Sequence, residues 1–75
     1  MFINLSIEAY EMTQDIRIDS GQKIGECVKV LQQSGRLPFG EIPEYFCSKM
    51  NQTLVSRHQT FEEASIFDGD TLSQI

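Results

Sequence analysis

Three side chains of the sequence have the chemistry of a nucleophile or a metal ligand: Cys27, Cys47 and His58. A cysteine and a histidine form a nucleophilic centre when a third group orients the base, and they bind zinc at CxxC or HxxxH spacing. Neither spacing occurs here. Cys27 falls on an apolar stripe, where cysteine acts as a small hydrophobic residue, and His58 lies in a polar run. We therefore predict no catalytic residues, no metal site and no cofactor from this set.

Paired acidic side chains offer a second possible chemistry. Asp68 and Asp70 flank Gly69. A calcium loop of the EF-hand type needs further oxygen ligands and a terminal glutamate, which this stretch lacks. Because Asp and Gly are the usual residues of tight turns, we predict a turn there. Glu62 and Glu63 are expected to form a solvated face rather than an acid–base pair, so the sequence predicts a protein that is not an enzyme.

Length and charge set the class of protein. The 75 residues are expected to form a single domain, 1–75, with six basic and eleven acidic residues and a net charge of −5. That balance repels a phosphate backbone, so nucleic acid is excluded as a partner. No apolar run approaches the roughly 18 residues of a spanning helix, and no secretory signal opens the chain. We expect a cytoplasmic protein with reduced cysteines and no direct membrane insertion.

Two segments near the N-terminus alternate between apolar and polar residues. Residues 2–9 and 15–19 each have a period of two, which predicts half-buried strands. The connection of residues 10–14 between them predicts an antiparallel hairpin. The predicted inward side chains are Ile3, Leu5, Ile7, Ala9, Ile16 and Ile18.

The period then changes to that of a helix. Asp19 or Ser20 can act as the N-cap, and Asp19 with Gln22 makes a possible capping box. Gly35 can supply the left-handed residue that closes a helix, which gives a predicted length of about fourteen residues. Gly25 lies inside this helix, opposite its apolar stripe. The predicted stripe is Ile24, Cys27, Val28 and Leu31.

The second half of the chain is predicted as a proline-containing loop, 36–44, followed by short elements. Strands are expected at 45–50, 54–55 and 71–75, with a brief helical turn or wrapped loop at 60–65. The predicted inward side chains are Phe46, Ser48 and Met50 on the first of these strands and Leu72 on the last. The fold class is therefore α+β, a mixed sheet of four to five strands packed on one helix, with the first and last strands parallel at its centre.

This order and these spacings resemble ubiquitin, the type member of the β-grasp superfamily. The most specific stretch is residues 60–66 (TFEEASI), followed by a turn and then Thr71 and Leu72. The sequence is more closely similar to YukD-like proteins, the small bacterial ubiquitin-like family of type VII (WXG100) secretion. Residues 2–7 (FINLSI), 15–18 (DIRI) and 68–72 (DGDTL) resemble that family's opening strands and terminal turn. Gln74 departs from the pattern, because the family tends to place an apolar residue there.

The resemblance to YukD-like proteins implies a cytosolic accessory or regulatory factor of the secretion machine that is not attached covalently to targets. Conjugated modifiers and sulfur carriers instead need a slim tail ending in Gly-Gly, since a Cβ would block entry to the activating enzyme. The sequence ends at the β-branched Ile75. We therefore expect neither conjugation nor sulfur transfer. The alternative is a ubiquitin-like modifier or sulfur carrier whose Gly-Gly tail lies beyond residue 75.

Ubiquitin-like domains commonly bind partners through the open face of the sheet. The matching side chains here, which form the predicted protein-binding site, are Phe2, Tyr45, Cys47, Lys49 and Ile75. An exposed apolar patch ringed by polar residues is typical of an interaction site. The expected partner is a protein, and the resemblance suggests the cytosolic part of a membrane-bound secretion component.

The loop before the third strand is a competing surface. Its apolar residues Leu37, Phe39 and Ile42 could cap the core or form a second docking edge. The sequence leaves the choice open, as it does the oligomeric state and the identity of the partner.

Overall fold

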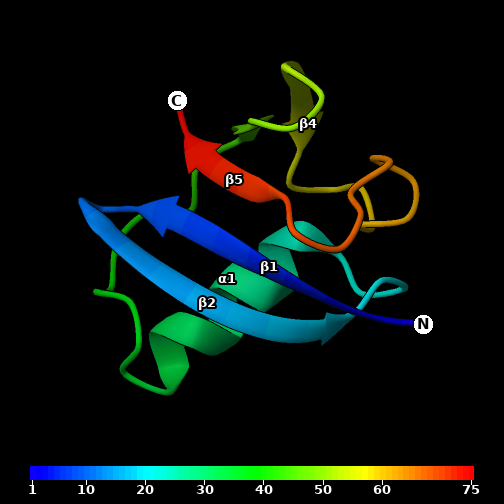
Figure 1. Cartoon of the computed structure of the whole chain (residues 1–75). Helices are drawn as coiled ribbons and strands as arrows, with labels where there is room; N and C mark the ends of the chain where they lie inside the picture. The colour runs from blue at the N-terminus through cyan, green and yellow to red at the C-terminus, as the bar shows by residue number, and fades with distance from the viewer.

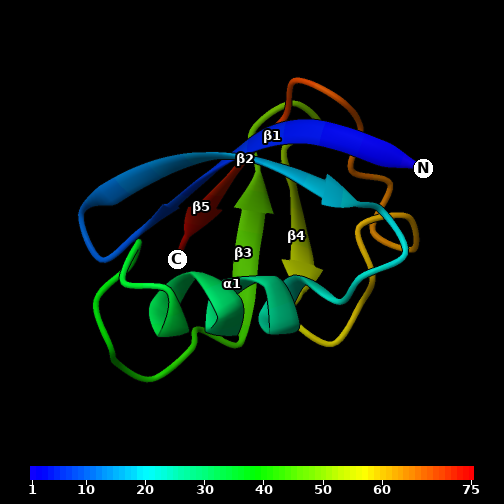
Figure 2. The ribbon, with the colours of Figure 1, turned by 90° about the horizontal axis from the view of Figure 1, so that it is seen from below.

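The alternating and helical patterns fold into two layers. The structure is a computed structural model that describes all 75 residues, Met1 to Ile75. A five-stranded sheet with the strand order β2-β1-β5-β3-β4 lies against one helix (Figures 1 and 2). The elements are β1 (Phe2–Ala9), β2 (Met12–Asp19), α1 (Ile24–Gln33), β3 (Tyr45–Ser48), β4 (Thr53–Ser56) and β5 (Thr71–Gln74). The predicted α+β class, with a mixed sheet on one helix, is confirmed.

The sheet has its first and last strands at the centre. β1 pairs with β5 in parallel, and the other neighbouring strands pair antiparallel. The apolar stripe of α1 and the inner side chains of β1 are buried together, as their periods of 3.6 and 2 predict. Further core residues come from the later segments, namely Leu37, Phe46, Val55, Phe61, Ala64, Ile66 and Leu72.

The first hairpin is tighter than predicted. β2 begins at Met12, so the turn is only Tyr10 and Glu11, and not the five-residue connection expected at 10–14. Both turn residues have positive φ, 54° and 62°. A two-residue hairpin turn with two left-handed residues follows the twist of its strands, but Asn and Gly are the usual residues for it. The sequence therefore lacked the usual signal for this turn.

The helix begins later than predicted, and its N-terminus is capped by distant backbone. Lys23 is the N-cap and makes no side-chain capping bond. The N–H groups of Ile24 and Gly25 donate to the carbonyls of Gln59 and Arg57 at 2.9 and 2.8 Å. The predicted cap at Asp19 or Ser20 is therefore wrong, because a loop far along the chain takes up these donors.

Asp19 instead closes a turn before the helix. It accepts the Gly21 N–H at 2.9 Å and lies 3.3 Å from the Met1 amino group. These two groups hold the pKa of Asp19 below its usual value. At the other end of α1, Gly35 has φ 78°, as predicted for a closing residue.

The later segments differ from the prediction in their faces and lengths. β3 ends at Ser48, and the predicted inward Met50 is 55% exposed because it lies in the following turn. Phe46 and Ser48 are buried as predicted. Residues 60–65 form a wrapped turn, in which Thr60 and Glu63 exchange backbone-to-side-chain hydrogen bonds of 2.8 and 3.0 Å. The single α-helix is too short to cross a membrane.

Candidate protein-binding surface

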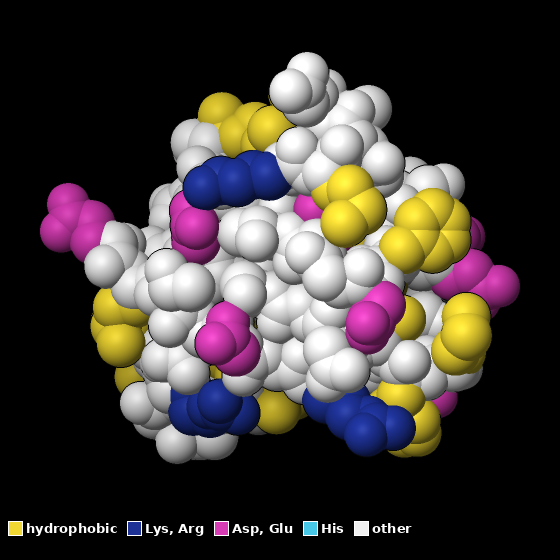
Figure 3. Space-filling model, in the orientation of Figure 1, with side chains coloured by type: hydrophobic (Ala, Val, Ile, Leu, Met, Phe, Trp, Pro, Cys, Tyr) yellow, Lys and Arg dark blue, Asp and Glu magenta, His cyan; other side chains and the backbone are white.

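The open face of the sheet, opposite α1, is mostly polar. Its middle is largely white in the space-filling view, with hydrophobic side chains around the rim (Figure 3). On this face Lys49 Nζ lies 3.0 Å from Glu8 Oε1, and Ser73 Oγ donates to the same carboxylate oxygen at 3.4 Å. The charge of Lys49, a predicted site residue, is therefore matched within the domain. The centre of the face offers hydrogen-bonding groups rather than an apolar surface.

Three exposed apolar side chains lie near one another, on β3, on β4 and just after β5. Tyr45 is 51% exposed, Leu54 62% and Ile75 69%, and together they line a hollow of about 490 Å³. We call these three residues the apolar edge. Cys47, a predicted site residue, is half-buried on the same face of β3, where it is paired with Leu54 and Ser73. The structure therefore places Tyr45, Cys47 and Ile75 of the predicted site near one another.

Leu54 was missed by the sequence reasoning. It lies beside Val55, and two adjacent apolar residues in a short strand do not show which one faces outward. The register of the hairpin decides this, because Leu54 lies opposite the outward Cys47, and Val55 opposite the buried Phe46. Pairing the β4 residues with β3 would have assigned Leu54 to the open face.

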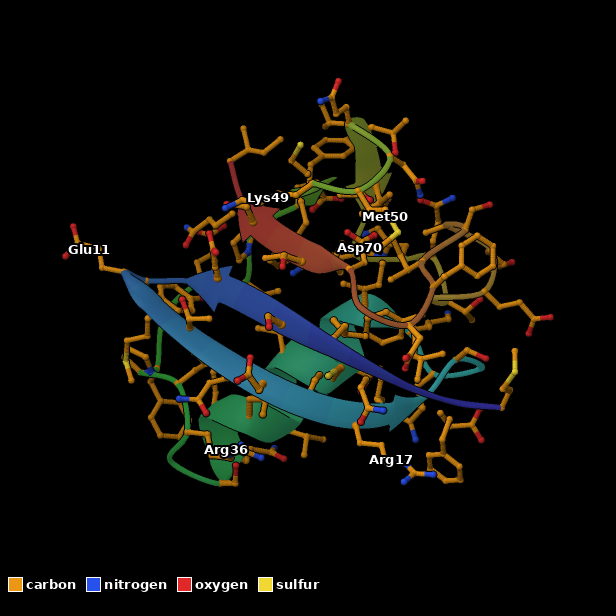
Figure 4. All side chains as sticks on the ribbon, viewed as in Figure 1. Glu11, Arg17, Arg36, Lys49, Met50 and Asp70 are labelled. Atoms are coloured by element: carbon orange, nitrogen blue, oxygen red, sulfur yellow. The ribbon has the colours of Figure 1, made fainter.

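Phe2 does not belong to the apolar edge. It lies at the start of β1, six residues and about 20 Å along the strand from Glu8, which neighbours Ser73. Its ring is stacked by Arg17, whose guanidinium carbon is 5.4 Å from the ring centre. Figure 4 shows Arg17 and Lys49 on opposite sides of the face. The predicted patch is thus divided into two separate regions.

The loop before β3 both covers the core and presents an apolar side chain. Leu37 is 2% exposed, and Ile42 is partly buried against the core. Phe39 between them is 80% exposed. Leu37 and Ile42 therefore cap the core, and a second docking edge at the exposed Phe39 stays a prediction.

Solved structures of known proteins share this arrangement of strands and helix. A de novo designed protein based on ubiquitin aligns with a TM-score of 0.68 and 20% identity, covering 96% of this chain and 84% of its own. The EccD5 ubiquitin-like domain from Mycobacterium xenopi aligns with a TM-score of 0.57 and 18% identity, over 97% of this chain and 91% of that one. The C-terminal ubiquitin-like domain of mouse tubulin-specific chaperone e aligns with a TM-score of 0.61 and 16% identity, over 96% of this chain and 82% of that one. The chain has a ubiquitin-like β-grasp fold.

No family model matches the sequence, and no curated protein matches it at a significant level. Because the similar structures are at most 20% identical to this chain, they show its fold alone. The closer likeness to YukD-like proteins remains a prediction.

The side chains with potential for covalent chemistry do not meet in this ubiquitin-like domain. Cys27 is buried under the sheet, and burial raises the pKa of its thiol to about 11. Cys47 lies on the open face of β3, and the exposed His58 follows β4 with its Nε2 3.0 Å from Glu44 Oε1. No three His, Cys, Asp or Glu side chains come together as a possible metal site.

The two aspartates of the last turn have different structural roles. Asp70 is 2% exposed, and its carboxylate accepts bonds from Ser48 Oγ at 2.6 Å, Met50 N at 3.0 Å and Thr71 N at 2.7 Å. Asp68 is exposed and accepts the Asn4 N–H at 2.6 Å. Figure 4 shows Asp70 at the start of β5, beside Met50. The buried carboxylate thus connects β5 to the end of β3.

Proposed function

We propose that this ubiquitin-like domain acts by non-covalent protein binding rather than by catalysis. Its role would be that of a cytosolic accessory or regulatory factor of a bacterial type VII secretion system. The docking surface is the apolar edge. The observation that supports this surface is its exposure: an aromatic and two large aliphatic side chains lie together in solvent, whereas Phe46 of β3 and Leu72 of β5 are buried on the other face of the sheet.

The apolar edge has the composition of an anchor site. Each of its large side chains gains roughly 1.5–3 kcal/mol when it is fully buried. Polar and charged groups surround it, since Glu41, Glu44, Arg57 and Gln74 line the same hollow. An apolar centre with a polar rim is the usual anatomy of a protein interface. Phe2 and Lys49 are left outside this surface, because one stacks with Arg17 and the other is paired with Glu8.

The choice of a secretion partner has two supports. The strand sequences FINLSI, DIRI and DGDTL resemble those of YukD-like proteins. EccD5, whose ubiquitin-like domain aligns over nearly the whole chain, is a type VII secretion component. We therefore propose that the partner is the cytosolic part of a membrane-bound component of that system.

Affinity capture from the native cells tests this proposal. The tagged wild-type domain and a Tyr45→Asp, Leu54→Asp variant are incubated with detergent-solubilised membranes, and bound proteins are identified by mass spectrometry. The wild type is expected to enrich a type VII component, and the variant to lose most of it, since two charges would have to be buried at the interface. The matched control is Phe67→Asp, because Phe67 is 57% exposed and precedes β5, whereas Ile75 follows it.

Two results would contradict the proposal. Retention of the same partner by the Tyr45→Asp, Leu54→Asp variant would exclude the apolar edge. Enrichment of no secretion component by a folded wild-type domain would exclude the secretion role. The intact mass of the native cellular protein tests the alternative function, because a modifier or sulfur carrier would show a longer tail or a covalent adduct.

A further inference from the structure

A groove of about 520 Å³ lies along the side of α1, and it shares Ile42 and Arg57 with the hollow beside the apolar edge. Its walls are α1, the loop before β3 and the segment after β4, which come to the same side of the helix (Figure 2). We call it the α1 groove. The residues that matter for its chemistry are Lys23, Lys29, Arg57, His58, Phe39 and Ile42, with Glu26 as its one acidic residue.

The α1 groove is a basic site in an acidic protein. Its three basic residues and one acidic residue sum to +2 with histidine neutral, which leaves −7 for the rest of a chain of net charge −5. Arg57 is partly neutralised, because its Nε lies 3.4 Å from Glu44 Oε2. Half of the six basic residues of the chain are therefore concentrated on one side of the helix.

The two lysines of the groove are the only basic residues without a partner inside the domain. Lys49 and Arg57 are ion-paired, Arg17 lies over the Phe2 ring, and Arg36 donates to the Asp15 carbonyl at 3.2 Å. Lys23 and Lys29 have no carboxylate within 4.0 Å and make no side-chain hydrogen bond, and both are exposed. Their charges are available to an acidic ligand without breaking an internal contact.

The loop that presents Phe39 is held in place by hydrogen bonds. Gln32 Nε2, on the buried side of α1, donates to the Gly40 carbonyl at 3.1 Å. Tyr10 Oη donates to the Glu41 carbonyl at 2.7 Å, and Arg57 Nη1 donates to that of Ile42 at 3.3 Å. Phe39 nevertheless remains 80% exposed at the groove. Because the backbone next to Phe39 is held in place, the loop needs little reordering to bind a ligand beside the unpaired lysines.

We propose that the α1 groove binds a short acidic segment of a partner protein, whose carboxylates meet Lys23 and Lys29 and whose apolar side chain packs on Phe39 and Ile42. A short peptide fits the charge pattern, since its acidic groups stay within the basic groove. A long polyanion such as nucleic acid would extend over the surrounding surface of charge −7 and be repelled. This inference goes beyond the proposed function, and it does not depend on the apolar edge or on a secretion partner.

A synthetic peptide tests the inference directly. The probe is a peptide of about ten residues, made of aspartate and glutamate with one central leucine, titrated into the ¹⁵N-labelled domain at low salt. Amide shifts are expected along residues 23–33, 39–42 and 57–58, and not along β1 or β5. The affinity should fall as salt is raised, because the attraction is between exposed charges. A peptide of the same length made of lysine with one leucine should not bind.

Two charge-matched variants distinguish binding in this groove from non-specific electrostatic attraction to the domain. Lys23→Gln with Lys29→Gln removes two positive charges in the groove, and Arg17→Gln with Lys49→Gln removes two elsewhere. The first pair of substitutions should lower the affinity for the peptide about fivefold, and the second pair less than about twofold. Phe39→Ala should also lower the affinity for the peptide but leave the salt dependence of that affinity unchanged. All these side chains are exposed, so the variants are expected to fold; circular dichroism checks this.

Three outcomes would overturn the inference. Equal weakening by the two charge-matched variants would show non-specific attraction. Peptide shifts confined to the apolar edge would place the binding elsewhere. Binding of anionic lipid vesicles or single-stranded DNA through Lys23 and Lys29, with no binding of the acidic peptide, would assign the groove to another class of ligand. None of these outcomes depends on the capture of a secretion component, so the two proposals can fail separately.

Discussion

The two hairpins of the sheet are stabilised in different ways. The β1–β2 hairpin has strands of eight residues, and the inner side chains of β1 are all apolar and at most 4% exposed. The β3–β4 hairpin has strands of four residues, and the inner Ser48 is polar and fully buried. Asp70, at the start of β5, accepts the bond from the Ser48 hydroxyl. The long hairpin therefore depends on apolar burial, and the short one also depends on a buried carboxylate.

This difference bears on the proposed function because two of the three residues of the apolar edge lie on the short hairpin. Tyr45 and Leu54 are on its outer face, where they contribute little to the core. With Phe46 and Val55 as its only buried apolar side chains, the hairpin needs the hydrogen bonds of Asp70 to keep its position. The inner carboxylate thus stabilises a hairpin whose outer face carries exposed apolar residues, as the proposed docking surface requires.

The largest expected effect is that of Asp70→Ala. This change removes the carboxylate that accepts hydrogen bonds from Ser48 Oγ, Met50 N and Thr71 N. The three donors then lack an acceptor in a largely buried site. We expect the free energy of unfolding to fall by about 3–5 kcal/mol, from urea denaturation. Amide exchange should accelerate more in β3 and β4 than in β1 and β2.

Asp68→Ala is the matched control for that prediction. Asp68 lies two residues away but is exposed, and its bond to Asn4 N is expected to contribute about 1 kcal/mol. Equal losses in the two variants, or uniform acceleration of exchange across both hairpins, would show that the short hairpin does not depend specifically on the buried carboxylate.

The apolar core beneath the long hairpin can be tested at alkaline pH through Cys27, which is one of its buried residues. Its pKa is raised from 9.0 to about 11 by burial. Because the folded pKa exceeds the unfolded one, the stabilisation is complete below pH 9 and is lost as the pH rises through 11. The total loss is about 2–3 kcal/mol.

The measurement is the stability of the wild type and of Cys27→Ala at several pH values from 8 to 11. Cys27→Ala starts lower because it leaves a cavity, but the gap between the two proteins should narrow as the pH rises. A constant gap would mean that the thiol reaches water in the folded state.

Glycine in the two hairpin turns should be stabilising. Glu11, with φ 62°, ends the turn of the long hairpin, and Gln52, with φ 55°, ends that of the short one. Both are exposed residues with a Cβ, so their left-handed backbone conformation is strained, whereas glycine adopts it without strain. Glu11→Gly and Gln52→Gly should each raise the free energy of unfolding by about 0.5–1 kcal/mol. Thermal melts of each variant measure the gain, and Glu11→Ala, which keeps the Cβ, should give none.

These turns also mark where the sequence was informative and where it was not. Alternation over residues 2–9 predicted each inward side chain of β1, because a one-residue error would have turned four apolar residues outward. The start of β2 was predicted three residues late, since Tyr10 and Glu11 give no signal of a tight turn. The first turn of α1 was mispredicted because its N–H groups bond to the carbonyls of residues 57 and 59, which no local pattern reveals.

The candidate surface was only partly predictable for a related reason. Tyr45, Cys47 and Ile75 followed from the alternation of β3 and from the resemblance. Leu54 required the register of the hairpin, and the separation of Phe2 required its place along β1. Met50 was predicted inward because the strand was extended past Ser48, where the buried Asp70 accepts the Met50 N–H in a turn. The turn was predicted at residues 68–70, but nothing in the sequence indicated that Asp70 is buried, because aspartate is seldom buried unless it is paired.

The smallest expected effect concerns the ion pair that joins the two hairpins across β5. Glu8 of β1 and Lys49 after β3 lie 3.0 Å apart on the open face, with side chains 35% and 54% exposed. Exposed pairs contribute little, so Glu8→Gln should lower the free energy of unfolding by about 0.5 kcal/mol or less at low salt, and by less still in 1 M salt. The control is Glu62→Gln, since Glu62 is exposed and its side chain has no partner; it should leave stability unchanged. A loss above about 1 kcal/mol that persists in high salt would mean that the pair, rather than Asp70, holds the short hairpin against the long one.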